Sequence, residues 1–100
     1  MASFEEHVRA ALDSLPPELA RALDNVAVVI EEANPEEPDL YGLFHQPEYM
    51  PAIISIYRRP LVEDFDDPAE LEAEIRITVL HELGHYFGMD EDQIAGLGYD

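Results

Sequence analysis

The 100-residue sequence contains no cysteine, no lysine and no tryptophan. Because cysteine is missing, disulfide bonds, thiolate nucleophiles and thiolate metal ligands are all excluded. The five basic residues are all arginines, and against 23 acidic residues they leave a formal net charge of −18. Nucleic acids and anionic membrane surfaces are bound through clustered basic side chains, so this charge balance predicts neither of them as a partner.

Long hydrophobic runs are missing as well. No apolar stretch approaches the roughly 18 residues of a membrane-spanning helix, and no basic segment followed by an apolar one indicates a secretory leader. We therefore expect a soluble, cytoplasmic protein. Hydrophobic residues make up 47% of the chain, which suffices for a packed core, and we expect a single domain over residues 1–100.

The first quarter of the chain predicts two helices. Ser3 is suited to cap the first helix, with Glu6 three residues later completing a capping box. Pro16 and Pro17 are expected to end this helix, because proline disrupts a helix interior. A second and shorter helix is expected over residues 18–24.

Three short, apolar segments predict β-strands. They are Val26–Ile30, Leu40–Phe44 and Ala52–Arg58. The third is the clearest, and we expect it to offer an edge on which an extended peptide could add as another strand. Pro60 is expected to end it, and the acid-rich residues 31–39 and 63–67 are predicted to be solvated loops.

A long helix is predicted in the last third of the chain. Asp67 lies where an N-cap belongs, Pro68 where the first helical residue belongs, and Glu70 three residues after the cap. The helix is expected to continue to Phe87, with Gly88 as a left-handed C-terminal stop. Its length of about 20 residues corresponds to roughly 30 Å.

One or two further helical turns are expected over residues 91–97. The order of the elements predicts an α+β fold in which the long helix packs against one sheet.

The long helix contains the segment His81-Glu-Leu-Gly-His85. Histidines four positions apart on a helix differ by about 40° in rotation, so both imidazoles can reach one metal ion at about 2.0–2.1 Å. Glu82 lies about 100° around the helix from His81, beside the ion, where it can act as a general base on a water molecule. The spacing predicts a metal site with His81 and His85 as ligands and Glu82 as the catalytic residue.

A chance occurrence of these three residues has to be weighed, because histidines on helices are usually surface or core residues. The context favours the metal site. The helix has a cap, Gly88 follows His85 by three residues, and Glu91 follows His85 by six, flanked by Asp90 and Asp92.

The two other histidines, His7 and His45, are isolated and are predicted to be surface residues. His45 follows a predicted strand, in a loop that could face the motif.

The segment His81–Asp92 resembles the extended zincin motif HExxHxxGxx(H/D/E), in which the third metal ligand follows the turn glycine. More narrowly, the chain resembles the small bacterial family of minimal zincin-like metallopeptidases. The likeness extends along most of the sequence. It includes Ala11–Pro16, Asn25–Glu31, Leu40–Leu43, Ile56–Leu61 and Leu97–Gly98.

This resemblance implies a zincin-like core, with a small mixed sheet packed against the active-site helix and with N-terminal helices. It also implies a Zn²⁺ site in which Glu91 is the third ligand after His81 and His85. Relatives often carry aspartate at this place, so Asp92 is an alternative if the turn is shifted by one residue, and Asp90 is a third candidate.

The function predicted first is that of a zinc metallopeptidase, a hydrolase that cleaves peptide bonds through a metal-activated water with Glu82 as general base. Its partner would be a peptide or an unfolded protein segment, and the negative surface favours basic or neutral peptides over acidic ones. The alternative is a metal-stabilised binding or regulatory module without proteolytic activity. An Fe(II) oxygenase site and an acidic mimic of nucleic acid are weaker alternatives. The sequence predicts no particular substrate or oligomeric state.

Overall fold

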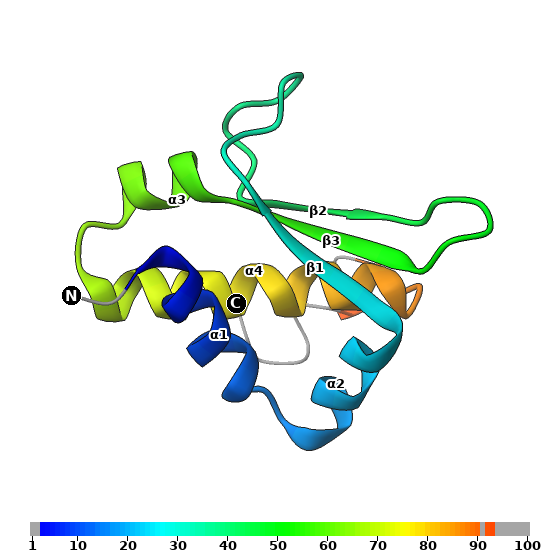
Figure 1. Cartoon of the computed structure of the whole chain (residues 1–100). Coiled ribbons are helices and arrows are strands. Elements are labelled where there is room, and N and C mark those ends of the chain that lie inside the picture. The colour runs from blue at the N-terminus through cyan, green and yellow to red at the C-terminus, as the bar shows by residue number, and fades with distance from the viewer. Residues whose placement is uncertain (1–2, 91, 94–100) are drawn as a thin grey trace.

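The computed structural model describes residues 3–90, 92 and 93 (Figure 1). This part of the chain contains four α-helices, a short 3₁₀-helix and three strands. They are α1 (Phe4–Asp13), α2 (Pro17–Ala22), η1 (Leu23–Asn25), β1 (Val26–Glu31), β2 (Gly42–His45), β3 (Ala52–Tyr57), α3 (Arg58–Asp64) and α4 (Pro68–Tyr86). The predicted α+β fold with one long helix is confirmed.

The three described strands form one mixed sheet in the order β1-β3-β2. β1 is parallel to β3, and β2 is antiparallel to it, so that Ile54 of β3 lies between Val28 of β1 and Phe44 of β2. The expectation that the Ala52–Arg58 segment forms an edge is therefore wrong. β3 is the central strand, and its residues are apolar because both of its faces are covered: Ile54 is 0% exposed and Tyr57 on the opposite face is 4% exposed.

α4 lies between the sheet on one side and α1 on the other, as Figure 1 shows. Two-sided cover explains why apolar residues occur around most of this helix, in contrast to an amphipathic surface helix. Ile75, Val79 and Leu83 are at most 1% exposed and meet Ile54 and Ile56 of β3 in one core. Burying each such side chain contributes about 1.5–3 kcal/mol, so the helix that carries the histidine motif is also central to the stability of the fold.

Both predicted N-terminal caps are confirmed. The amide of Glu6 donates to Oγ of Ser3 over 3.2 Å, and the amide of Glu70 donates to Oδ2 of Asp67 over 3.1 Å. Pro68 occupies the first turn of α4, where its missing amide proton has no helical partner to lose.

The helix α3 was not predicted, and residues 63 and 64 belong to it and not to a loop. Pro60 is its third residue, a position in the first turn where proline is tolerated. Leu61 is 0% exposed and anchors α3 in the core. Arg58 begins this helix, and its Nε donates to Oε1 of Glu32 over 2.7 Å, which lowers the pKa of that carboxyl.

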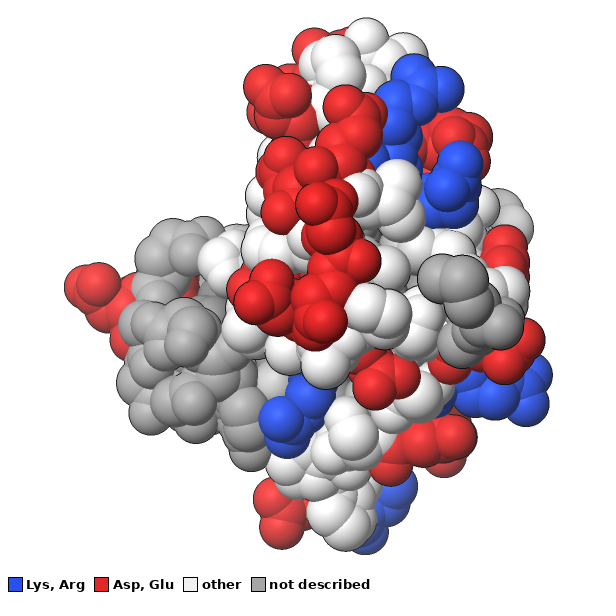
Figure 2. Space-filling view, turned by 90° about the vertical axis from the view of Figure 1, so that its left-hand side faces the viewer, with Lys and Arg blue, Asp and Glu red and all other residues white. Residues whose placement is uncertain are grey.

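The acidic residues are spread unevenly over the surface. Figure 2 shows the side of the molecule that lies on the left in Figure 1, where acidic side chains form a band and arginines lie at its margins. Arg58 and Arg59 both pair with Glu32, so within the described part of the chain these two cations share one carboxylate. Among the described residues, no helix is long and apolar enough to cross a membrane.

The hydroxyl of Tyr41, in the segment that leads into β2, donates a hydrogen bond to the carboxylate of Asp64 in α3. This bond, followed by burial and by the charges of Asp64, Glu74 and Asp39, raises the pKa of Tyr41 from 10.0 to about 12. Because the folded protein holds this proton more tightly than the unfolded chain, the interaction stabilises the fold fully below pH 10. The stabilisation is lost as the pH rises toward about 12.

We expect Asp64→Asn to bring the pKa of Tyr41 back toward 10, since the main cause of the shift is removed. Asp39→Asn is the matched control. It also removes one carboxylate charge, but the charge of Asp39 contributes least to the raised pKa of Tyr41. Alkaline titration followed by tyrosinate absorbance measures the shift, with Tyr41→Phe identifying the signal. Equal shifts in both asparagine variants would contradict the assignment.

Candidate metal centre

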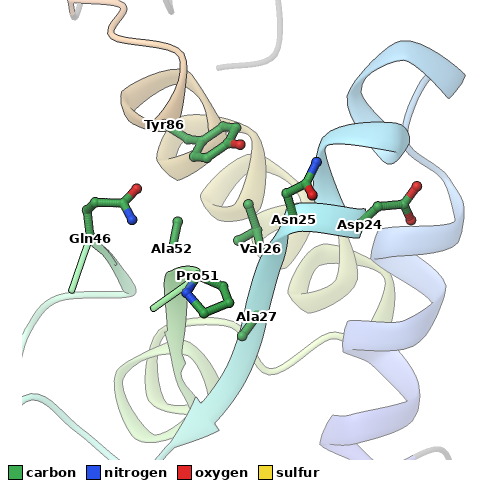
Figure 3. A pocket seen from close by; sticks show the side chains of 8 residues that line it. All are labelled: Asp24, Asn25, Val26, Ala27, Gln46, Pro51, Ala52 and Tyr86. Atoms are coloured by element: carbon green, nitrogen blue, oxygen red, sulfur yellow. The ribbon is translucent and has the colours of Figure 1, made fainter. Parts of the chain in front are cut away.

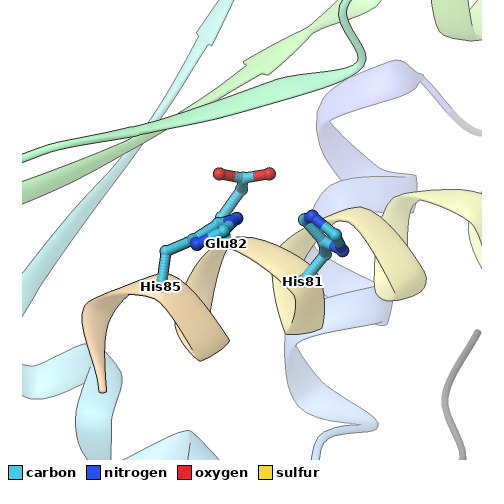
Figure 4. A group of neighbouring side chains, drawn as sticks. All are labelled: His81, Glu82 and His85. Carbon is cyan, nitrogen blue, oxygen red and sulfur yellow. The ribbon is translucent and has the colours of Figure 1, made fainter. Parts of the chain in front are cut away.

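His81, Glu82 and His85 lie in the last two turns of α4 and extend from the same side of the helix toward the overlying strands (Figure 4). Their ligating atoms all lie within 4.8 Å of one another. The two imidazole rings are 5.0 Å apart between centroids and 76° apart in orientation. Two nitrogens bound to one ion at about 2.0–2.1 Å lie within about 4 Å of each other, so the two imidazoles lie near the separation that a shared metal ion requires.

The carboxylate of Glu82 is buried, with 9% of the residue exposed, and it contacts the edge strand β2. The amide of Phe44 donates to its Oε1 over 2.9 Å. The amide of Tyr57 in β3 donates to the carbonyl of Tyr41. In an antiparallel pair, successive residues of a strand direct their main-chain groups alternately toward and away from the partner strand. The amides of Gly42 and Phe44 therefore point away from β3. A buried carboxylate needs hydrogen-bond donors, and the outward amide of Phe44 is one of them.

Gly42 allows β2 to approach α4 this closely. A Cβ atom at this position would lie 2.6 Å from Cγ2 of Thr78, closer than real Cβ atoms come, and 3.0 Å from the carbonyl oxygen of Ser55, which is a tight contact. This role of Gly42 was not predicted from the sequence. Its signal is a glycine inside a predicted strand, which often indicates close approach of another element.

The end of α4 is the one that the sequence predicts. Gly88 has a φ of 74°, and its amide donates to the carbonyl of His85 over 3.0 Å. The amide of Met89 donates to the carbonyl of Gly84 over 2.9 Å. These two bonds form a Schellman motif, which reverses the chain directly after His85.

The three candidates for a third ligand follow this turn. Asp90 and Gln93 exchange hydrogen bonds of 2.8 Å, the side chain of each accepting from the amide of the other. The carboxylate of Asp90 thus caps the following turn. Asp92 is exposed, and Glu91 lies outside the described residues.

The remaining histidines do not join the group. His45 is the last residue of β2 and is exposed, on the face opposite to Phe44, whose ring packs against Tyr86 of α4. The predicted surface position of His45 is therefore confirmed, and His45 lies in the strand and not in a loop that faces the motif. His7 is not the surface residue that was predicted, because its side chain is 14% exposed and its Nδ1 lies 3.5 Å from Oε1 of Glu72.

Two hollows lie near this end of the molecule. One, of about 520 Å³, lies between the start of β3 and the end of α4, where Gln46, Pro51, Asn25 and Tyr86 line it (Figure 3). The other has about 260 Å³ and is lined by both His81 and Glu82. Only the second of these two hollows includes residues of the motif.

A family model described as zincin-like metallopeptidase matches residues 23–99. The chain belongs to this family. The match covers the whole sheet and all of α4, and therefore the helix that carries the histidines, whereas α1 precedes it. No curated protein matches the chain.

Membership of the zincin-like metallopeptidases implies a metal ion, usually zinc, and peptides as substrates. The His81, Glu82 and His85 cluster has the donor types and the spacing to hold such an ion.

We expect Gly42→Ala to destabilise this zincin-like chain by about 1–3 kcal/mol, because the added methyl group forces β2 away from α4. Thr78→Ser removes the Cγ2 atom that the new methyl meets, while a serine hydroxyl still donates to the carbonyl of Glu74 as Thr78 does over 2.8 Å. The double variant should regain part of the lost stability in urea unfolding. It should also restore protection of the Phe44 amide in hydrogen exchange. A double variant less stable than Gly42→Ala would show that the contact with Cγ2 of Thr78 does not limit how closely β2 approaches α4.

Proposed function

We propose that this protein is a zinc-dependent metallopeptidase in which His81, His85 and Glu91 hold Zn²⁺ and Glu82 is the general base. The observation that carries the proposal is the convergence of the donor atoms of His81, Glu82 and His85 within 4.8 Å, on the long helix of a chain from a metallopeptidase family. A bound zinc ion would supply a Lewis acid that polarises the scissile carbonyl and lowers the pKa of water to about 7.

Glu82 is the residue proposed to move the proton. It lies about 100° around the helix from His81, beside the position between the two imidazoles. In this mechanism its carboxylate accepts a proton from the attacking water and passes it to the leaving amine. The hydrogen bond from the amide of Phe44 fixes the orientation of the carboxylate before substrate arrives.

The choice of Glu91 as third ligand is supported by its neighbour. Asp90 already uses Oδ1 to accept from the amide of Gln93, so binding metal would compete with capping. Glu91 is the residue at the offset of the extended motif, and Asp92 remains the alternative.

The substrate is proposed to lie along β2. Among the described residues this strand is an edge of the sheet on the side of Glu82. Glu82 occupies the outward amide of Phe44, and an extended peptide would add to the edge through the remaining main-chain groups. Gly42 lies against Thr78 and Glu82, and the amide of Phe44 bonds to Glu82, so a peptide paired with β2 would lie close to the motif.

One observation favours the alternative of a metal-stabilised binding module without hydrolysis. Glu82 bonds to the backbone of β2, so a glutamate at this position has a structural use that does not depend on catalysis. The variants described next separate the two functions.

For metal binding, we expect His81→Ala and His85→Ala each to reduce zinc affinity strongly. Losing a residue that only hydrogen-bonds to a metal ligand costs roughly 10–100-fold in affinity, and losing a ligand itself should cost more. His45→Ala, an exposed histidine on the opposite face of β2, is the control and should bind zinc as the parent does. Glu91→Ala should weaken binding, and Asp92→Ala should not. Competition titrations with a zinc chelator measure the affinities. Loss confined to Asp92→Ala would reassign the third ligand, and full zinc binding by His81→Ala would refute the site.

For catalysis, we expect Glu82→Gln to keep fold and zinc affinity and to lower hydrolysis of a quenched random-peptide library by about 10²–10⁴-fold. Glutamine still offers an oxygen to the amide of Phe44 but cannot accept the proton from water. Equal cleavage by the variant and the parent would exclude Glu82 as the base. A parent chain that binds zinc and cleaves nothing would favour the binding module.

A further inference from the structure

The hollow of about 260 Å³ beside the motif lies between α4 and the segment that enters β2. Leu40, Tyr41 and Gly42 line it from the strand side, and Glu74 and Ile77 line it from α4, next to His81 and Glu82. Its volume is smaller than the roughly 300–1,000 Å³ of pockets that enclose whole ligands. It has room for one long side chain.

Glu74 is aligned with the histidines. It precedes His81 by seven residues, so the two side chains differ by about 20° in rotation and lie about 10 Å apart along α4. Residues of an extended peptide are spaced by about 3.3 Å. When the scissile bond lies at His81, a long side chain one or two residues away can therefore reach into the hollow toward Glu74.

The electrostatic potential on the side of the hollow near Glu74 and Tyr41 is negative. The charges of Asp64, Glu74 and Asp39 all act on the hydroxyl of Tyr41 and contribute to its raised pKa. Of the nearby cations, Arg58 and Arg59 pair with Glu32. A cationic side chain entering here is attracted by these carboxylates, whereas an acidic one is repelled and a neutral one has no charge to pair with them.

The remaining walls suit the stem of such a side chain. Leu40 and Ile77 present aliphatic surface, and the methylene groups of lysine and arginine commonly lie along apolar surface while the charged end meets a polar partner. The hollow thus combines an apolar entrance with a carboxylate aligned with the histidines.

We propose that this hollow is a substrate pocket that takes an arginine or lysine side chain one or two residues from the scissile bond, and that Glu74 determines this specificity by pairing with the cation. The inference rests on the proposed function for the position of the scissile bond. It goes beyond the general preference of an acidic protein for cationic peptides, because it assigns the preference to one carboxylate.

The test uses peptides that differ at a single position near the cleaved bond, with arginine, lysine, leucine or glutamate there. We expect the parent to cleave the arginine and lysine peptides with about 5–10-fold higher kcat/KM than the leucine peptide, as for a partly exposed charge-assisted pair. Glu74→Gln should reduce this ratio to near 1, and Glu74→Asp, which keeps the charge, should retain part of it.

The matched control is Glu72→Gln. It removes the same charge two residues away, from a side chain that contacts His7, and should leave the ratio unchanged. An equal loss in Glu72→Gln and Glu74→Gln would show that overall surface charge sets the preference and would overturn the proposal.

Binding is measured separately, so that failure of the proposed hydrolysis does not obscure the result. The same arginine and leucine peptides are titrated calorimetrically into the metal-free parent, Glu74→Gln and Glu72→Gln. Tighter binding of the arginine peptide that depends on Glu74 supports the pocket, even if no peptide is cleaved and the proposed function fails. Cleavage and binding without any preference for arginine or lysine would overturn the pocket and leave the proposed function intact.

Discussion

The backbone of β2 lies against α4 closely enough for the amide of Phe44 to reach the buried carboxylate of Glu82. Both the sheet edge and the motif depend on this contact. Without it, a charged group that is 9% exposed would lose a donor, and the edge strand would lose its connection to the helix. The missing side chain of Gly42 makes the approach possible, so the position of Glu82 depends on a residue 40 positions earlier in the sequence.

α4 contributes one face to the core and another face to the candidate site. Ile75, Val79 and Leu83 face the core, while His81 and His85 are only partly buried. Core substitutions in α4 that shift the helix would also shift the imidazoles relative to β2. Stability and site geometry are therefore coupled in this small domain, where one helix contributes much of the buried surface.

The features that sequence analysis predicted are local ones. The caps at Ser3 and Asp67, the stop at Gly88 and the spacing of His81 and His85 each depend on residues within a few positions of one another. The features it missed depend on distant partners. α3 forms around Pro60 because Leu61 is drawn into the core, and β3 becomes central because β1 and β2 pair on either side of it. No local pattern shows that Gly42 meets Thr78.

The Schellman ending of α4 also fixes where the helix dipole ends. Backbone carbonyls in the last turn carry a partial negative charge of about half an elementary charge, and this turn contains His85. A cation held by the two histidines would therefore lie near the negative pole of a 19-residue helix. If Gly88 were replaced and the helix continued, that pole would move along the chain and away from the ion. The glycine that turns the chain back thus also determines how strongly the helix itself attracts a positive charge.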